Sequence, residues 1–280
     1  MPFIETRDGV RLFYRDWGTG RPVLFLSAWA MDSTEARGAM SQLAEHGLRA
    51  IGLDRRGHGR SDDPGHGYDY DTLADDVAAL IDHLDLRELT LVGHSMGGGE
   101  VARYLTRHGD DRVARIALVA AAMPLMRATP DNPGGIPVED AARQRASWKW
   151  NLGGWLDANT GPYVGDGLPG CDVSPPARAR ALDTIMTTSL RAVIECNRAV
   201  VETDFRTELP KIAVPTLIVH GDHDASISLE LGGRRQAELI PGAQLKVYEN
   251  APHGLYLTHP ERLSADLLAF ATAPDGAIGQ

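Results

Sequence analysis

The sequence predicts an α/β protein in which a mostly parallel sheet carries helices on both faces. Short apolar runs, typical of strands buried on both faces, alternate with stretches of helical periodicity along most of the chain. One long segment, residues 124–207, breaks this alternation with prolines, glycines and tryptophans. We therefore expect a core built from residues 1–123 and 208–280, with residues 124–207 as a mainly helical cap over the carboxyl edge of the sheet, where open α/β sheets bind ligands.

Eight strands can be placed in order along the chain. They are expected over residues 3–6, 10–16, 22–27, 48–53, 89–92, 113–120, 214–219 and 244–248. Asp8-Gly9 separates the first two, which predicts an antiparallel hairpin. Between the strands, apolar residues at helical spacing predict helices over residues 35–46, 70–84, 100–105, 176–199, 228–239 and 260–271.

Length, composition and charge set the outer limits. The chain has 280 residues, 43% of them hydrophobic and 24% charged, as expected for a folded protein with one large core. A signal peptide and an apolar run long enough to span a membrane are both missing, so we expect a cytoplasmic protein with no membrane partner. The formal net charge of −10 disfavours nucleic acid as a partner. Cys171 and Cys196 lack metal-ligand spacing and are expected as free thiols.

The most specific motif of the chain surrounds Ser95. Gly93 and Gly97 bracket this serine as Gly-X-Ser-X-Gly, between an apolar strand and a helix. A nucleophile lifted out on a tight turn holds a strained backbone, and side chains two positions before and after it would collide. We therefore predict Ser95 as a nucleophile at the end of its strand. The free N–H groups of the following helix should face any charge that forms there.

A serine hydroxyl needs a base within hydrogen-bond reach and a carboxylate that orients the base. His253 is the candidate base, because it lies in a loop directly after the last expected strand, at the same sheet edge as Ser95. Three other histidines compete. His220 still belongs to a strand, His259 lies just before the last helix, and His223 lies in the loop that also offers the acid.

The acid is expected on a loop between the serine and the histidine in chain order. Gly221-Asp222-His223-Asp224 follows a strand and offers two carboxylates. Asp224 is freer to reach the base, whereas Asp222 is better placed to brace the loop through backbone N–H groups. Residues 120–124, at the other strand end where an acid could lie, contain no carboxylate. Asp224 is therefore our candidate, with a turn-forming role for both aspartates as the alternative.

Acyl transfer also needs N–H donors for the charge that develops on the carbonyl oxygen. Met96, directly after the nucleophile, supplies one N–H group, and Trp29, after the third expected strand, is the candidate for the second. The Trp29 ring could equally wall the pocket. In the cap, Trp148, Trp150 and Trp155 indicate either an apolar or aromatic substrate or tryptophans that cover the core.

The chain resembles the α/β-hydrolase superfamily, and within it the bacterial aryl esterases and cofactor-free haloperoxidases, also called perhydrolases. The segments that carry this similarity are DRRGHGRSD, LVGHSMGGGEVARY, ETDF, VPTLIVHGDHD and APHGLYLTHPERLSADLLAF. The similarity covers nearly the whole chain and is weakest over residues 134–180. It implies an α/β-hydrolase fold with catalytic and oxyanion residues at Ser95 (nucleophile), Asp224 (acid), His253 (base), Trp29 and Met96 (N–H donors). Such a mechanism requires no metal or organic cofactor.

One departure from this family lies in the predicted oxyanion loop. Such relatives usually carry His-Gly-Trp, often followed by proline, where this chain has Ser27-Ala28-Trp29-Ala30. Ala28 removes easy access to positive φ, and Ser27 removes a ring that would brace the loop. We therefore expect the loop to be held differently. The smaller Ser27 side chain should leave room for a bulkier acyl group or a lactone ring, and Ala30 should weaken peracid formation.

Together these features predict a serine hydrolase that cleaves a small-molecule carboxylic ester or lactone through an acyl-enzyme. The first alternative is a cofactor-free perhydrolase or haloperoxidase. A hydroxynitrile lyase and a non-hydrolytic ligand receptor follow, because fold and triad do not fix the reaction. A serine in this motif disfavours haloalkane dehalogenases and epoxide hydrolases, which are generally built around an aspartate there. The complete set of site residues disfavours a purely structural protein, and a homo-oligomer is compatible with the sequence.

Overall fold

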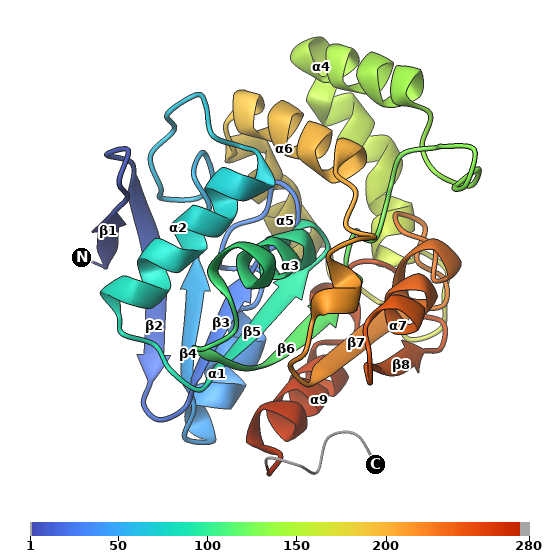
Figure 1. Cartoon of the computed structure of the whole chain (residues 1–280). Coiled ribbons are helices and arrows are strands. Elements are labelled where there is room, and N and C mark those ends of the chain that lie inside the picture. The colour runs from blue at the N-terminus through green and yellow to red at the C-terminus, as the bar shows by residue number, and fades with distance from the viewer. Residues whose placement is uncertain (1, 275–280) are drawn as a thin grey trace.

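Residues 2–274, described by a computed structural model, form a central sheet with helices on both faces and a helical cap above one edge (Figure 1). The sheet has eight strands in the order β1-β2-β4-β3-β5-β6-β7-β8. Their bounds are β1 Phe3–Glu5, β2 Arg11–Gly18, β3 Pro22–Leu26, β4 Arg49–Leu53, β5 Leu89–His94, β6 Val113–Val119, β7 Thr216–Gly221 and β8 Gln244–Tyr248. β2 pairs antiparallel with β1 and β4, and every later pairing is parallel. The predicted fold class is confirmed.

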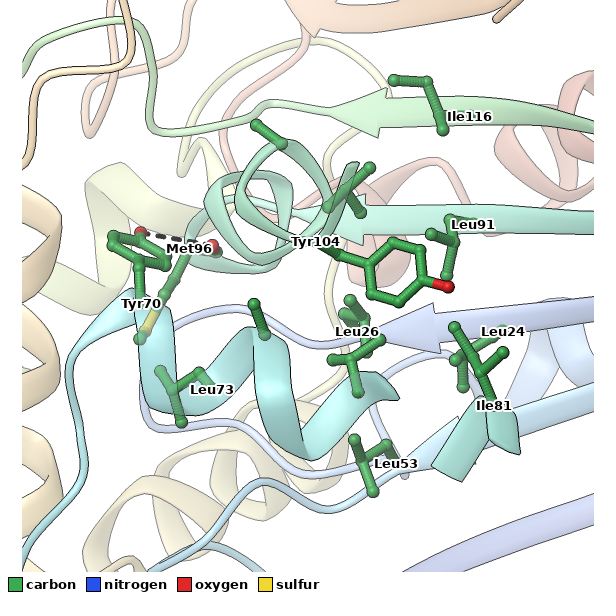
Figure 2. Close-up of a cluster of buried hydrophobic side chains, with 14 of the residues drawn as sticks. Leu24, Leu26, Leu53, Tyr70, Leu73, Ile81, Leu91, Met96, Tyr104 and Ile116 are labelled. Carbon is green, nitrogen blue, oxygen red and sulfur yellow. Dashed lines mark hydrogen bonds between the residues drawn. The ribbon is translucent and has the colours of Figure 1, made fainter. Parts of the chain in front are cut away.

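Helices cover the two faces of the sheet because its central strands are apolar throughout. β3 and β5 are buried along their whole length. On one face, α2 (Tyr70–His83) and α3 (Met96–His108) pack against these strands, as Figure 2 shows for Ile81 of α2 beside Leu24 of the sheet. On the other face lie α1 (Arg37–Glu45) and α9 (Pro260–Thr272). This double cover is what a mostly parallel sheet requires.

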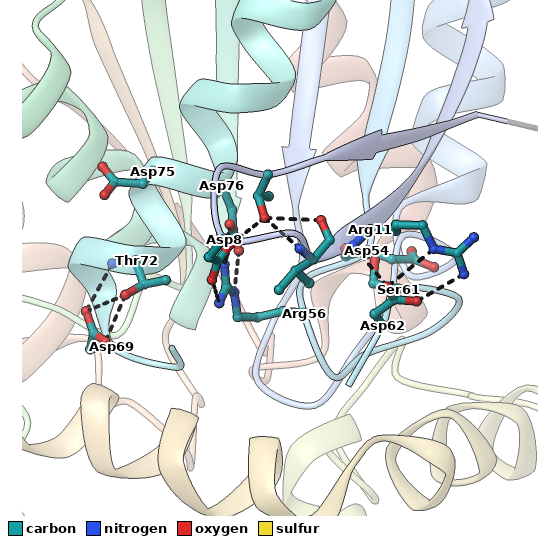
Figure 3. Close-up of polar contacts among 12 residues, drawn as sticks. Asp8, Arg11, Asp54, Arg56, Ser61, Asp62, Asp69, Thr72, Asp75 and Asp76 are labelled. Carbon is teal, nitrogen blue, oxygen red and sulfur yellow. Dashed lines mark hydrogen bonds and ion pairs between the residues drawn. The ribbon is translucent and has the colours of Figure 1, made fainter. Parts of the chain in front are cut away.

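The loop after β4 is fixed to the rest of the core by ion pairs (Figure 3). The Arg56 guanidinium is buried and donates to both carboxylate oxygens of Asp76 on α2, at 2.7 and 2.6 Å. It also donates to Asp8 in the first hairpin at 3.0 Å. Three segments that are distant in sequence therefore meet at one arginine, which holds the glycine-rich loop in place below the cap.

The cap contains three helices, α4 (Val138–Val164), α5 (Pro175–Thr187) and α6 (Leu190–Glu202). The single helical stretch expected over residues 176–199 is wrong, because the chain turns at Thr188 and Ser189, and the Ser189 side chain caps α6. The sequence analysis assigned no helix to α4. This helix has a kink at Asn151, whose side chain accepts the Gly154 N–H at 3.0 Å and starts the second half of the helix.

The helix expected over residues 228–239 is also divided. A π-helical turn (Glu230–Arg234) precedes α7 (Arg235–Leu239), and Gly232 and Gly233 pack closely around the His220 ring at the end of β7. The remaining helical elements are the 3₁₀ turn Leu209–Lys211 and the short α8 (Leu255–Thr258). None of the helices within residues 2–274 combines the length and hydropathy needed to cross a membrane.

Candidate active site

Ser95 lies on a sharp turn between a strand and a helix. β5 ends at His94 and α3 begins at Met96, and Ser95 between them has φ 50° and ψ −113°. A Cβ atom at Gly93 would lie 2.5 Å from the Gly97 carbonyl oxygen, and one at Gly97 would lie 2.3 Å from the Leu26 carbonyl oxygen. Both distances are far too short for non-bonded atoms, so this turn requires the two glycines.

Three of the predicted site residues meet in one hydrogen-bonded row. His253 follows β8, and its Nε2 lies 2.9 Å from the Ser95 Oγ, while its Nδ1 lies 2.7 Å from Asp224 Oδ2. All three residues are buried. An ionised carboxylate can only accept, so the Nδ1 atom of His253 carries a proton and Nε2 is left free to accept the serine hydroxyl.

Asp224 is held in place by the loop after β7. Its Oδ1 accepts the backbone N–H groups of Ser226 at 2.9 Å and Ile227 at 2.8 Å. Burial works to raise the pKa of Asp224, but the charge and hydrogen bond of His253, the charge of His220 and the Ile227 N–H group outweigh it and leave the pKa below its usual value. The acid is therefore ionised at neutral pH.

The other candidate acid and bases have different places. Asp222 accepts the Ala251 N–H at 3.3 Å and pairs with the exposed His223, which is the bracing position expected for it. His259 immediately precedes α9. The buried His220 lies on the far side of the acid, with its Nε2 2.8 Å from the Ile227 carbonyl oxygen and 3.4 Å from Asp224 Oδ2. Sequence reasoning considered His220 only as a base and missed this contact with the acid.

The loop after β3 lines the same cavity as Ser95. Arg55, buried against Glu100, donates to the carbonyl oxygens of Ser27 at 2.8 Å and Ala28 at 3.4 Å. In a trans peptide the N–H group points opposite to the carbonyl, so the Trp29 N–H points away from Arg55. Within residues 2–274, neither this N–H nor that of Met96 has a recorded acceptor. Both groups remain available to a ligand.

The loop predicted to supply an oxyanion donor has its positive φ at a position other than residue 28. Ala30, not residue 28, has a positive φ of 58°. The Ser27 hydroxyl donates to the Asp32 carbonyl oxygen at 2.9 Å, inside the loop. The Trp29 ring both walls the cavity and ties the loop to the cap, because its Nε1–H donates to the Val193 carbonyl oxygen at 2.8 Å.

A cavity of about 320 Å³ lies between the core and the cap, with Ser95 and His253 in its wall. Its lining is predominantly apolar. Trp148 and Trp155 of α4 line it together with Trp29, and the three rings pack with centroids 5.0 to 5.8 Å apart. Trp150 points outward and is 89% exposed. Two of the three cap tryptophans thus form the pocket. No cluster of metal-ligating side chains occurs in the described part of the chain.

The fold and the arrangement around Ser95 are those of an α/β hydrolase. Residues 21–162 match the family described as alpha/beta hydrolase fold, so the chain belongs to that family. A non-heme haloperoxidase of Rhodococcus erythropolis is 43% identical over 96% of this chain and 99% of its own. A bifunctional esterase/perhydrolase of Acinetobacter calcoaceticus is 39% identical over the same shares. Among solved structures, an esterase from Exiguobacterium antarcticum has a TM-score of 0.92 at 31% identity, covering 97% of this chain and 99% of that one.

Proposed function

We propose that this protein is a serine hydrolase that cleaves carboxylic esters or lactones through an acyl-enzyme. The observation that carries the proposal is the unbroken row from Ser95 Oγ through His253 to Asp224, with contacts of 2.9 and 2.7 Å. The relatives support it, since one is called an esterase and another an esterase/perhydrolase.

In the first half of the reaction, His253 Nε2 takes the hydroxyl proton as Ser95 Oγ bonds to the carbonyl carbon of the substrate. The carbonyl π electrons move to oxygen, where the N–H groups of Trp29 and Met96 would receive the charge. One such donor contributes about 10²–10³ in rate in serine hydrolases of known mechanism. The tetrahedral intermediate then collapses and expels the alcohol, which takes the proton from His253 and leaves the acyl group on Ser95.

Water completes the cycle with the same residues. His253 removes a proton from water as the oxygen attacks the acyl carbon, and the second collapse releases the acid and restores the Ser95 hydroxyl. Asp224 stays ionised throughout and stabilises the imidazolium. For a lactone the alcohol and the acid belong to one molecule, so a hydroxy acid leaves in the second step.

The apolar cavity favours an ester with an aliphatic or aromatic acyl or alcohol part. Its lining by Trp29, Trp148 and Trp155 offers flat apolar faces, and buried apolar surface contributes about 25 cal/mol per Å² to binding before the costs of association. The names of the relatives favour a second activity, perhydrolysis, in which hydrogen peroxide replaces water in the deacylation step and a peracid leaves.

A substrate panel on the purified protein tests the proposal. We would compare aryl acetates, longer aryl esters and γ- and δ-lactones, and run hydrogen peroxide with acetate alongside. Intact-mass spectrometry after treatment with an organophosphonate would show whether one serine is modified. We expect ester or lactone turnover with a single modification, and strong peracid formation would favour the second activity. No turnover and no modification would contradict both.

A further inference from the structure

A second buried pair, Glu35 and His94, lies behind the reacting residues and has no part in the mechanism above. Glu35 belongs to the turn between β3 and α1, and His94 is the last residue of β5, directly before Ser95. The His94 Nδ1 and Glu35 Oε1 atoms are 2.9 Å apart, and the two side chains are 1% and 3% exposed. Neither residue was singled out by the sequence analysis.

The pair joins two segments that the reaction depends on. The other carboxylate oxygen of Glu35 accepts the backbone N–H of Ala28 at 2.9 Å. The other nitrogen of His94 lies 3.2 Å from the carbonyl oxygen of His253. One end of the pair therefore touches the loop that presents the Trp29 N–H, and the other end touches the backbone of the proposed base.

The contacts of the pair are satisfied by an ionised Glu35 and a doubly protonated His94. In that state both His94 nitrogens donate, to Glu35 and to the His253 carbonyl, and both Glu35 oxygens accept. The directions of the two pKa shifts favour this ionised state. Burial opposes both charges, but their mutual attraction outweighs it: the pKa of His94 is raised and the pKa of Glu35 is lowered.

Other titratable groups surround this ion pair. The rings of His253 and Tyr256 lie 5.3 and 5.4 Å from the His94 ring. Tyr163 of α4 packs edge-on against His253, and its pKa is raised by burial and by the carboxylates of Glu35 and Asp224. The surrounding side chains keep water away from the pair. A buried ion pair of this kind contributes little stability relative to packed apolar side chains, so stability alone does not explain it.

We propose that Glu35 and His94 are positioning residues that fix the distance between the oxyanion loop and the base. Glu35 holds the Ala28 N–H while Arg55 holds the Ala28 carbonyl, so the two peptides that flank the Ala28 Cα atom are both held, and the second of them carries the Trp29 N–H. His94 fixes the backbone of His253 relative to this peptide. This inference rests on the proposed serine-hydrolase function. It assigns to Glu35 and His94 an effect on the reaction that does not require contact with the substrate.

The central test separates positioning from stability by replacing the ion pair with apolar side chains. The double variant Glu35→Leu/His94→Phe fills a similar volume and should remain folded, with a lower melting temperature because the Ala28 N–H and the His253 carbonyl lose their partners. We expect its kcat on an aryl ester to fall on the order of 10- to 100-fold while KM changes less than about 3-fold, because misplaced reacting groups cost rate. The rate of Ser95 modification by an organophosphonate should fall in parallel.

Glu35→Gln is the matched conservative variant. Its amide oxygen can accept the Ala28 N–H, and its amide N–H can donate to a neutral His94 that still donates to His253. All three contacts survive without charge, so we expect kcat within about 3-fold of the wild type. Hydrogen exchange should increase over residues 27–31 and 252–256 in the double variant but not in Glu35→Gln.

Several outcomes would overturn the inference. Wild-type kcat in a folded double variant would show that the pair positions nothing. Parallel losses of kcat, substrate affinity and melting temperature would show a merely structural role. If the double variant does not fold, Glu35→Asp replaces it, because its shorter side chain cannot reach both Ala28 and His94, and wild-type kcat there would again contradict the inference. A wild-type protein without ester turnover or Ser95 modification would instead refute the proposed function. The hydrogen-exchange experiment would still test whether Glu35 and His94 hold the backbone at Ala28 and His253.

Discussion

The two walls of the cavity are built on different principles. On the core side, the polar groups around Ser95 are hydrogen-bonded to other buried groups, as in the pairs Asp224 with His253 and Glu35 with His94. The cap side is formed by α4, α5 and α6, which lie above the sheet (Figure 1), and the residues by which they line the cavity are mainly apolar. Hydrogen bonds that join the walls include Gly254 N–H to the Tyr163 carbonyl at 2.9 Å. We therefore propose that residues of the core determine which reaction occurs and that residues of the cap determine which substrate enters.

The largest expected effect belongs to the core wall. Ser95→Ala removes the only atom that can form the acyl-enzyme, so kcat should fall on the order of 10⁴-fold or more. Intact-mass spectrometry should show no modification by an organophosphonate, whereas the wild type gains one adduct. Continued modification of the variant would show that another residue is the nucleophile. It would then contradict the proposal that the core side of the cavity carries out the reaction.

The acid offers a sharper test with a matched control in the same loop. Asp224→Asn places an amide donor against His253 and favours the wrong tautomer of the base, so kcat should fall on the order of 10⁴-fold. Asp222→Asn, two residues away, keeps an oxygen that can accept the Ala251 N–H and loses only its charge toward the exposed His223, so it should keep kcat within about 3-fold. Steady-state kinetics on one aryl ester checks both. Equal losses in the two variants would assign the effect to loop disruption instead.

The loop predicted to supply an oxyanion donor belongs to the core side of the cavity but contacts the cap. Substitutions at Ala30 test whether the conformation of this loop matters for the reaction. Proline cannot adopt the φ of 58° found at Ala30, so Ala30→Pro must rearrange the loop, at an expected cost of about 1–3 kcal/mol in the free energy of unfolding. Its kcat should fall on the order of 10-fold or more. Ala30→Gly, which tolerates this φ, should keep both quantities near the wild type. A proline variant with undiminished ester turnover and wild-type stability would contradict this account, whereas increased peracid formation would agree with the expectation that Ala30 weakens it.

The cap wall should show the smallest effect on rate and the clearest effect on selectivity. Trp155→Ala enlarges the pocket beside Trp29, so the ratio of kcat/KM between bulky and small acyl esters should change about 10-fold while acetate turnover changes less than about 3-fold. Trp150→Ala, on the outward face of the same helix, is the control and should change neither. If Trp155→Ala lost as much acetate turnover as turnover of bulky esters, the proposal that the cap affects selectivity and not the reaction itself would be wrong.

The sequence predicted the parts of the molecule that depend on local patterns. Apolar runs located the strands, and the glycines around Ser95 located the turn that the structure shows. Ser95, Asp224 and His253 could be chosen because loops at one sheet edge must converge, and the structure brings them together. Their catalytic roles, like those of Trp29 and Met96, remain predictions.

The parts that the sequence did not predict depend on contacts between distant segments. Glu35 resembles an ordinary exposed acid before a helix, and only the fold brings it to Ala28 and His94. The one available signal was a histidine at position 94, at the end of an otherwise apolar strand. In α4, the buried positions 141, 145, 148, 152 and 156 keep a helical spacing, but one of them is the charged Arg145, and Gly153, Gly154 and Pro162 disfavour a helix in the sequence.

The backbone of Ser95 sets a limit on how heat-resistant this chain can become while it stays active. Its φ of 50° belongs to a region that costs a residue with a side chain about 1–3 kcal/mol, and the folded protein carries this cost with or without substrate. Glycine would relieve much of the cost but has no hydroxyl. Selection for stability and selection for the proposed activity therefore favour different residues at this position. A descendant that no longer needed the activity could increase its free energy of unfolding by replacing this serine.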